Sequence, residues 1–158
     1  EYLIRGLGRF TSAADIGAYE YQVPQITIET VDASRVEGNG GTTAFSFRVL
    51  RSGDTRVPSS VGWLPEGHGT HQADAGDFPP TTWAGGTVHF AIGQTEATLL
   101  IHVNGDSSAE NTEGFAVELV TPTNGRLGGA STATGQIIAP SATTGNTAGA
   151  NDYAVYDA

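Results

Sequence analysis

The chain has 158 residues, of which 38% are hydrophobic and 15% charged, and it contains no Cys and no Met. Its 17 acidic residues face only 7 basic ones, all of them Arg, so the formal net charge is −10. The lack of Cys excludes disulfide scaffolds and Cys-ligated zinc sites. No apolar run reaches the about 18 residues that a membrane-spanning helix needs, and a surface this acidic disfavours nucleic acid and anionic lipid.

Apolar residues recur with a period of two, which is typical of half-buried strands. Residues 43–51 are the clearest case, because Phe45, Phe47 and Val49 fall on one face. Gly and Asn clusters, which favour turns, separate such runs at short intervals. Seven strands are predicted, near residues 25–31, 43–51, 60–64, 87–92, 97–103, 114–120 and 132–138. This pattern predicts an all-β fold, an antiparallel β-sandwich.

The same alternation predicts which side chains enter the core. We expect Val88, Phe90 and Ile92 to point inward, together with the apolar residues of alternating position in the later strands. Leu100 breaks the alternation of its strand and is expected to be covered from outside. Trp63 and Phe78 are expected to pack in the core or to cap it.

The two ends of the chain fall outside the predicted sandwich. Residues 1–24 form a strand-like extension that contains Tyr2, Leu3 and Ile4, and residues 140–158 form a Ser/Thr/Gly-rich linker with a short terminal strand. In that terminal strand Tyr153, Val155 and Tyr156 stand in an alternating run. Because the sequence begins at Glu1 without a leader pattern, we interpret it as a segment of a larger exported protein, extracellular or at a bacterial cell surface.

Several motifs, read together, resemble a known family. The opening motif spans residues 36–55, with Val-Glu-Gly-Asn-Gly-Gly-Thr-Thr followed by Phe-Ser-Phe-Arg-Val and Arg-Ser-Gly-Asp-Thr. Further matches follow in order, at residues 73–78, 86–90, 93–95, 103–106, 110, 113–115 and 135–138. From about residue 25 to residue 139 the chain resembles a Calx-beta domain. The stretch from Asp15 to Tyr21 resembles the closing turn of a bacterial surface-protein parallel β-helix.

The resemblance implies an immunoglobulin-like sandwich without catalytic activity. It also implies that Ca²⁺ ligands gather at one end, and by position these are Glu37, Asp77, Asp106, Glu110 and Glu113. The sequence departs from the family pattern at Thr112 and at Ala139-Pro140, where the family usually has acidic residues. The acidic loop is therefore either a weak Ca²⁺ site or a solvated acidic segment.

Other chemistry finds less support in the sequence. His68 and His71, with Asp74 and Asp77 nearby, offer imidazole and carboxylate groups to a transition metal, although a polar loop explains them as well. We find no nucleophile elbow, zinc-protease motif or phosphate-binding loop, so we do not expect an enzyme. Trp83, beside a Pro-Pro-Thr-Thr segment, is a candidate platform for carbohydrate.

Three functions remain open on this evidence. The first is a structural subunit that assembles into a homo-oligomer or filament by strand addition between copies. Its candidate donor strands are Tyr2, Leu3 and Ile4 at one end, or Tyr153, Val155 and Tyr156 at the other. The second is a Ca²⁺-binding adhesion or spacer module of a large surface protein, and the third is a carbohydrate-binding module.

Overall fold

The computed structural model describes residues 22–108 and 110–140, which carry nine strands and two short helices. One sheet has the order β6-β3-β1-β8 and the other the order β2-β9-β7-β4-β5. The strands of the first sheet are β1 (Gln25–Asp32), β3 (Thr42–Ser52), β6 (Glu96–Asn104) and β8 (Arg126–Leu127). Those of the second are β2 (Ser34–Val36), β4 (Ser59–His68), β5 (Gly86–Phe90), β7 (Glu113–Thr123) and β9 (Thr132–Ile138). The helices η1 (Ala75–Asp77) and α1 (Pro80–Trp83) lie between β4 and β5.

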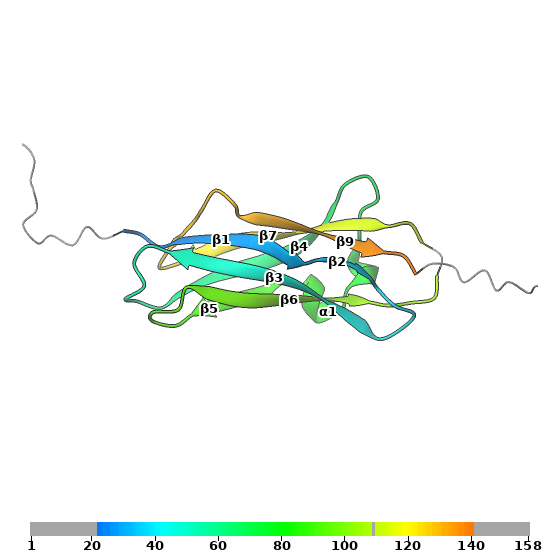
Figure 1. Cartoon of the computed structure of the whole chain (residues 1–158), viewed down its shortest axis with the longest axis horizontal. Helices are drawn as coiled ribbons and strands as arrows, with labels where there is room; N and C mark the ends of the chain where they lie inside the picture. The colour runs from blue at the N-terminus through cyan, green and yellow to red at the C-terminus, as the bar shows by residue number, and fades with distance from the viewer. Residues whose placement is uncertain (1–21, 109, 141–158) are drawn as a thin grey trace, which may run out of the picture.

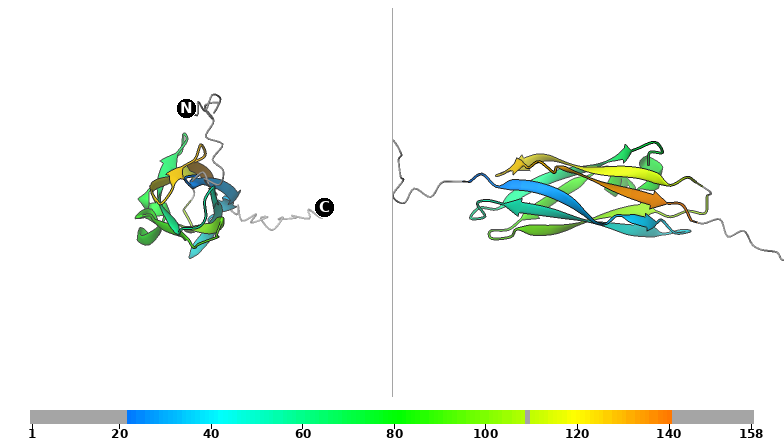
Figure 2. Two further views of the ribbon diagram at one scale, coloured as in Figure 1. Left: turned by 90° about the vertical axis from the view of Figure 1, so that its left-hand side faces the viewer. Right: turned by 45° about the horizontal axis from the view of Figure 1, so that its top comes forward.

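The sheets pack face to face in an elongated sandwich, and the view along its long axis shows them enclosing the interior (Figures 1 and 2). Most neighbouring strands are antiparallel, and only the short strands β2 and β8 pair in parallel. Phe45, Phe47 and Val49 on β3 are fully buried, and Phe115 on β7 meets the first two edge to face across the interior. Such T-shaped contacts add to the gain from burial. The predicted β-sandwich is confirmed.

The strand β4 is longer than the alternation predicts, because it continues through Pro65 and Gly67 to His68. Proline lacks the N–H that a strand between two neighbours must donate. Here, however, the pairing of β4 with β5 ends at Trp63 and Gly86, so Pro65 has a ladder partner only on β7. The three-residue β2 and the two-residue β8 were not predicted, since strands this short show no period.

Two predictions of burial are wrong. Ile92 is 68% exposed, because β5 ends at Phe90 and the chain turns at Gly93, which has a φ of 79°. Leu100 is 47% exposed on the outer face of β6, so nothing in the described residues covers it. Trp63 and Phe78 are buried as expected.

The first and last strands place the two ends of the described chain at opposite ends of the sandwich. The chain enters β1 at one end of the long axis and leaves β9 at the other (Figure 1). The candidate donor strands at residues 2–4 and 153–156, and the β-helix-like stretch at residues 15–21, lie outside the described residues. Among the residues that are described, no helix is long and apolar enough to cross a membrane.

A buried arginine closes the end where β1 begins. Arg51, on β3, is 2% exposed and is the largest fully buried side chain. Its guanidinium donates to the carbonyl oxygens of Gln94, Val57 and Ala91 at 2.8–2.9 Å, and to Ser59 Oγ at 2.9 Å. It also lies 5.4 Å from the ring centroid of Phe90. One side chain thus ties two loops and the start of β4 to the core.

Candidate metal centre

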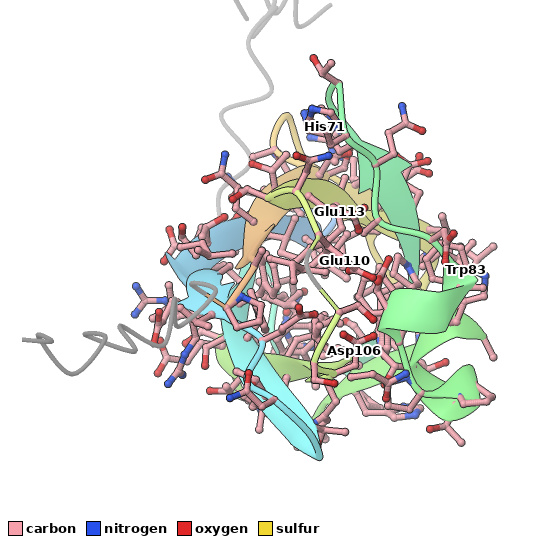
Figure 3. The ribbon with its side chains drawn as sticks, turned by 90° about the vertical axis from the view of Figure 1, so that its right-hand side faces the viewer. His71, Trp83, Asp106, Glu110 and Glu113 are labelled. Atoms are coloured by element: carbon pink, nitrogen blue, oxygen red, sulfur yellow. The ribbon has the colours of Figure 1, made fainter. Side chains whose placement is uncertain are left out.

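The acidic residues singled out in the sequence come together at the end of the sandwich where β9 finishes. Glu37 follows β2, Asp77 ends η1, Asp106 follows β6, and Glu110 and Glu113 lead into β7. Figure 3 looks onto this end, where Glu110 and Glu113 lie between His71 and Asp106. The sandwich topology therefore brings together carboxylates from segments more than 70 residues apart, at positions 37 and 113.

Three of these carboxylates form the tightest group. One oxygen each from Asp77, Glu110 and Glu113 lies within 4.8 Å of the other two. Ca²⁺ binds protein oxygens at about 2.3–2.6 Å, so two oxygens on one ion are separated by at most about 4.6–5.2 Å. The spacing of the group fits a single Ca²⁺ ion.

Glu37 gives an independent indication of a cation. The residue is only 2% exposed, and its Oε1 is buried without a hydrogen-bond partner in the described residues. A carboxylate buried without a partner carries a large desolvation cost. Its charge interacts unfavourably with those of Glu110, Asp106 and Asp77. A cation among these four side chains would supply the partner that Glu37 lacks.

The proton affinities of the cluster show the same repulsion. Burial, followed by repulsion from Asp77 and a hydrogen bond with it, raises the pKa of Glu113 to about 7. The pKa of Glu37 and that of Glu110 are also raised, in each case by desolvation first and by neighbouring carboxylates second. Without a cation, these groups hold protons at higher pH than usual, first because burial disfavours the charged form and second because the neighbouring carboxylates repel one another.

A small turn sets the position of Asp77. Asp74 caps η1, with its Oδ1 accepting from Gly76 N at 2.7 Å, while Asp77 Oδ2 accepts from Asp74 N at 2.6 Å. This reciprocal capping holds the Asp77 carboxylate in place. Asp74 also repels Glu110 and Glu113, so it belongs to the electrostatic surroundings of the site. The family motif did not point to Asp74 as a site residue; its spacing of three from Asp77 was the available signal.

The remaining predicted positions lie around this cluster. Asp106 accepts from Ser108 N at 2.7 Å, which orders the loop between β6 and β7. Thr112 is exposed, and Ala139 and Pro140 follow β9 without adding a carboxylate. Of the five predicted acids, Asp77, Glu110 and Glu113 lie close enough to share an ion, while Glu37 and Asp106 lie near enough to interact electrostatically with that group.

The two histidines do not join the metal cluster. His68 ends β4, His71 lies in the following turn, and both are exposed. With Thr112, Glu113 and Gln136 they line an open cleft of about 400 Å³. Within the described residues, the group of His and acidic side chains close enough to share an ion is Asp77, Glu110 and Glu113.

Trp83 ends the helix α1 and stacks on Phe78, with ring centroids 5.2 Å apart and planes inclined by 28°. Phe78 in turn meets Phe115 edge to face in the core. One face of the indole is therefore used for packing. The described contacts account for Trp83 as part of the cover over the core.

Comparison with solved structures identifies the fold. The apo-form Calx CBD1 domain is 25% identical with a TM-score of 0.58, over 75% of this chain and 99% of that domain. CBD12 from CALX1.2 is 26% identical with a TM-score of 0.57, over 73% of this chain and 45% of that chain. The calcium binding domain CBD12 of CALX1.1 is 26% identical with a TM-score of 0.56, over 71% of this chain and 44% of that chain.

The chain thus spans less than half the length of the two CBD12 structures. No protein-family model and no curated protein matches the sequence. The agreement in fold extends over nearly the whole of the CBD1 domain, and the sequence motifs between residues 25 and 139 point to the same family. The described residues form a sandwich of the Calx-beta domain type.

Proposed function

We propose that this chain is a non-catalytic Ca²⁺-binding domain whose site is formed by Glu37, Asp77, Asp106, Glu110 and Glu113. The buried, unpartnered Oε1 of Glu37 carries the proposal, because a cation held by Asp77, Glu110 and Glu113 would compensate its charge, which interacts with those of Asp77 and Glu110. One of the similar structures is described as a calcium binding domain. Bound Ca²⁺ would join loops from both sheets and remove the repulsion among them.

The donor set favours Ca²⁺ over other metals. All five groups offer carboxylate oxygen, which suits hard cations, whereas Zn²⁺ and Cu²⁺ prefer nitrogen or sulfur ligands. The acids come from three separate connections of different length, those between β2 and β3, β4 and β5, and β6 and β7. Such a site adapts to the six to eight oxygens that Ca²⁺ takes more readily than to the octahedron that Mg²⁺ demands. Waters and loop carbonyls would complete the shell.

Titration of Ca²⁺ into chelator-treated protein tests the proposal. We expect calorimetric heat at micromolar to millimolar Ca²⁺ and a rise in the melting temperature. Asp77→Asn and Glu110→Gln should each weaken binding at least about tenfold, because each removes a charged ligand. Glu118→Gln is the matched control, since Glu118 is an exposed acid on the outer face of β7. A wild-type protein that shows neither a heat of binding nor a higher melting temperature at millimolar Ca²⁺ would exclude the site.

The position of the chain ends suits a module within a longer extracellular array. The described chain enters at one end of the sandwich and leaves at the other (Figure 1), the end at which Asp106, Glu110 and Glu113 lie (Figure 3). Units joined in this way form an extended string, and Ca²⁺ would stiffen each unit at its outgoing end. We therefore infer a spacer or adhesion role outside the cell.

A second candidate, assembly by strand addition between copies, is favoured by an incompletely paired strand. Away from β3, β1 pairs with β8 only at Gln25 and Ile26. Beyond that point a groove of about 370 Å³ runs between residues 30–34 and residues 134–136. Val31 in its wall is 58% exposed. Unpaired strand edges of this kind accept an added strand from another chain.

Deleting the terminal segments tests this second candidate. If residues 153–156 are the donated strand, the full chain should form higher oligomers in analytical ultracentrifugation, and a chain without residues 141–158 should sediment as a monomer with an almost unchanged melting temperature. Deletion of residues 1–21 tests the other donor in the same way. A full chain that is monomeric at all concentrations, or oligomers that survive both deletions, would rule out strand addition by these segments.

A further inference from the structure

The dipeptide Asn104-Gly105 lies where three loops of the acidic cluster meet. Asn104 is the last residue of β6 and pairs with Thr42 at the start of β3. Gly105 contacts the loop of residues 37–41, and Asn104 contacts the turn of residues 74–78. Asp106, itself one of the five acids, follows directly.

Asn104 connects β6 to the turn that carries Asp77. Its side-chain Nδ2 donates to the carbonyl oxygen of Gly76 at 2.9 Å. Gly76 directly precedes Asp77, whose carboxylate is already fixed by the reciprocal capping with Asp74. The amide therefore ties the Asp77 turn to the strand that leads into Asp106. A carboxylate or a methyl group at this position has no N–H to donate.

Gly105 connects the same strand to the loop that carries Glu37. Its N–H donates to Gly41 O at 3.0 Å. A Cβ at residue 105 would lie 2.8 Å from Gly38 O, 2.9 Å from Glu37 O and 3.0 Å from Gly40 N. These are backbone atoms, which cannot rotate away as a side chain can. Only glycine lets the two loops approach this closely.

We propose that Asn104 and Gly105 are positioning residues of the cation site, holding the Glu37 loop and the Asp77 turn against Asp106 so that their carboxylates reach one ion. The proposal rests on the proposed Ca²⁺ site and extends it to residues that do not touch the ion. Neither residue contributes a ligand through its side chain. Their effect is to reduce the rearrangement that binding would otherwise require.

The test is the Ca²⁺ dissociation constant of variants measured by calorimetry, with the melting temperature in chelator as a separate readout. Asn104→Ala removes one hydrogen bond, for which about a fivefold weaker affinity is expected. Gly105→Ala separates two backbones, and at least about a tenfold loss is expected. Asn104→Asp is the sharpest variant: added negative charge alone would tighten Ca²⁺ binding, whereas loss of the donor to Gly76 should weaken it.

A matched control for Asn104 lies at the opposite end of the sandwich. Asn124 also precedes a glycine, and its Nδ2 donates to Pro58 O at 3.0 Å. Because Asn124 has a φ of 53°, Asn124→Gly removes the amide without backbone strain. This control should lower the melting temperature in chelator but leave Ca²⁺ affinity unchanged.

The outcomes separate the two proposals. A wild-type chain that binds Ca²⁺, with variants at 104 and 105 that bind it as tightly, would overturn the positioning role alone. So would tighter binding by Asn104→Asp, or an equal loss of affinity in Asn124→Gly. A wild-type chain that does not bind Ca²⁺ would overturn the proposed function itself. Should Gly105→Ala fail to fold, the two Asn104 variants still decide the question.

Discussion

Replacing Arg51 with Met is expected to lower the free energy of unfolding by about 3–5 kcal/mol, the largest loss we expect from a single substitution outside the apolar core. The guanidinium is buried and makes four hydrogen bonds, three of them to backbone carbonyl oxygens. Met fills a similar volume but donates nothing. The part-buried hydrogen bonds to the carbonyls of Val57, Ala91 and Gln94 would be lost. A hydrogen bond that involves a charged group contributes about 1.5–3 kcal/mol.

Urea unfolding of two further variants shows whether the contribution of Arg51 to stability comes from the geometry of its hydrogen bonds or from its charge. Arg51→Lys keeps the charge, but its single ammonium cannot reproduce the fork that reaches two loops and Ser59, so a substantial part of the loss should remain. Arg48→Met is the matched control on the same strand: Arg48 is about half exposed and pairs with Glu29 at the surface. Exposed pairs contribute about 0–1 kcal/mol. Equal losses for Arg48→Met and Arg51→Met would contradict this account.

Arg51 also shows what the alternation of residues along a strand can and cannot predict. The period of two that places Phe45, Phe47 and Val49 in the core places Arg51 there as well. A charged residue is an improbable core residue unless its partners are known. Those partners are carbonyl groups in loops at residues 57, 91 and 94, which the sequence pattern does not bring together. Alternation predicts direction, but satisfaction of a buried polar group depends on tertiary structure.

The strands that sequence reasoning found are those with long alternating runs, and its errors lie at their ends. Pro65 and Gly67 conceal the second half of β4, because the propensity against them assumes pairing on both sides. The turn at Gly93 exposes Ile92, which the alternation alone would bury. Such boundaries are set by the neighbouring strands and cannot be deduced from local sequence.

For the candidate site, spacing within the family motif was sufficient to name five acids that the structure places at one end. The burial of Glu37 was not predictable, because the Gly38-Asn39-Gly40-Gly41 segment that follows is typical of an exposed turn. The loop that carries Glu37 packs against Gly105, which lies 68 residues later in the chain, and the local sequence does not show this contact. The sequence indicates Asp74 only as a partner of the histidines, since its capping role depends on the geometry of η1.

The metal-free domain is expected to be less stable at pH 8 than at pH 5, and Ca²⁺ is expected to reverse this trend. The pKa of Glu113 is raised from an ordinary value of 4.5 to about 7, and those of Glu37 and Glu110 are raised in the same direction. A raised carboxyl pKa favours the folded state below the unfolded-state pKa, and that contribution is lost as the pH rises through the folded-state value. The loss should therefore fall between about pH 4.5 and pH 7.

Ca²⁺ competes with protons for the same carboxylates. The rise in melting temperature that saturating Ca²⁺ produces should accordingly be larger at pH 8, where the cluster is ionised, than at pH 5. Glu113→Gln stays neutral throughout this range. It should raise the melting temperature of the metal-free domain at pH 8, flatten its dependence on pH, and reduce the response to Ca²⁺. One substitution would then stabilise the domain while impairing its site.

Thermal unfolding in chelator and in Ca²⁺ at pH 5, 6, 7 and 8 would measure these effects. Asp54 does not titrate between pH 5 and pH 8, because a hydrogen bond from Arg56 lowers its pKa to about 2. Its contribution to stability therefore changes only in stronger acid. Glu118→Gln removes the same charge from an exposed outer position and so reports the general effect of a chain with net charge −10. If the two Gln variants behaved alike, the pH dependence would come from overall charge. A difference confined to Glu113→Gln would assign it to the carboxylates that face one another at the end of the sandwich.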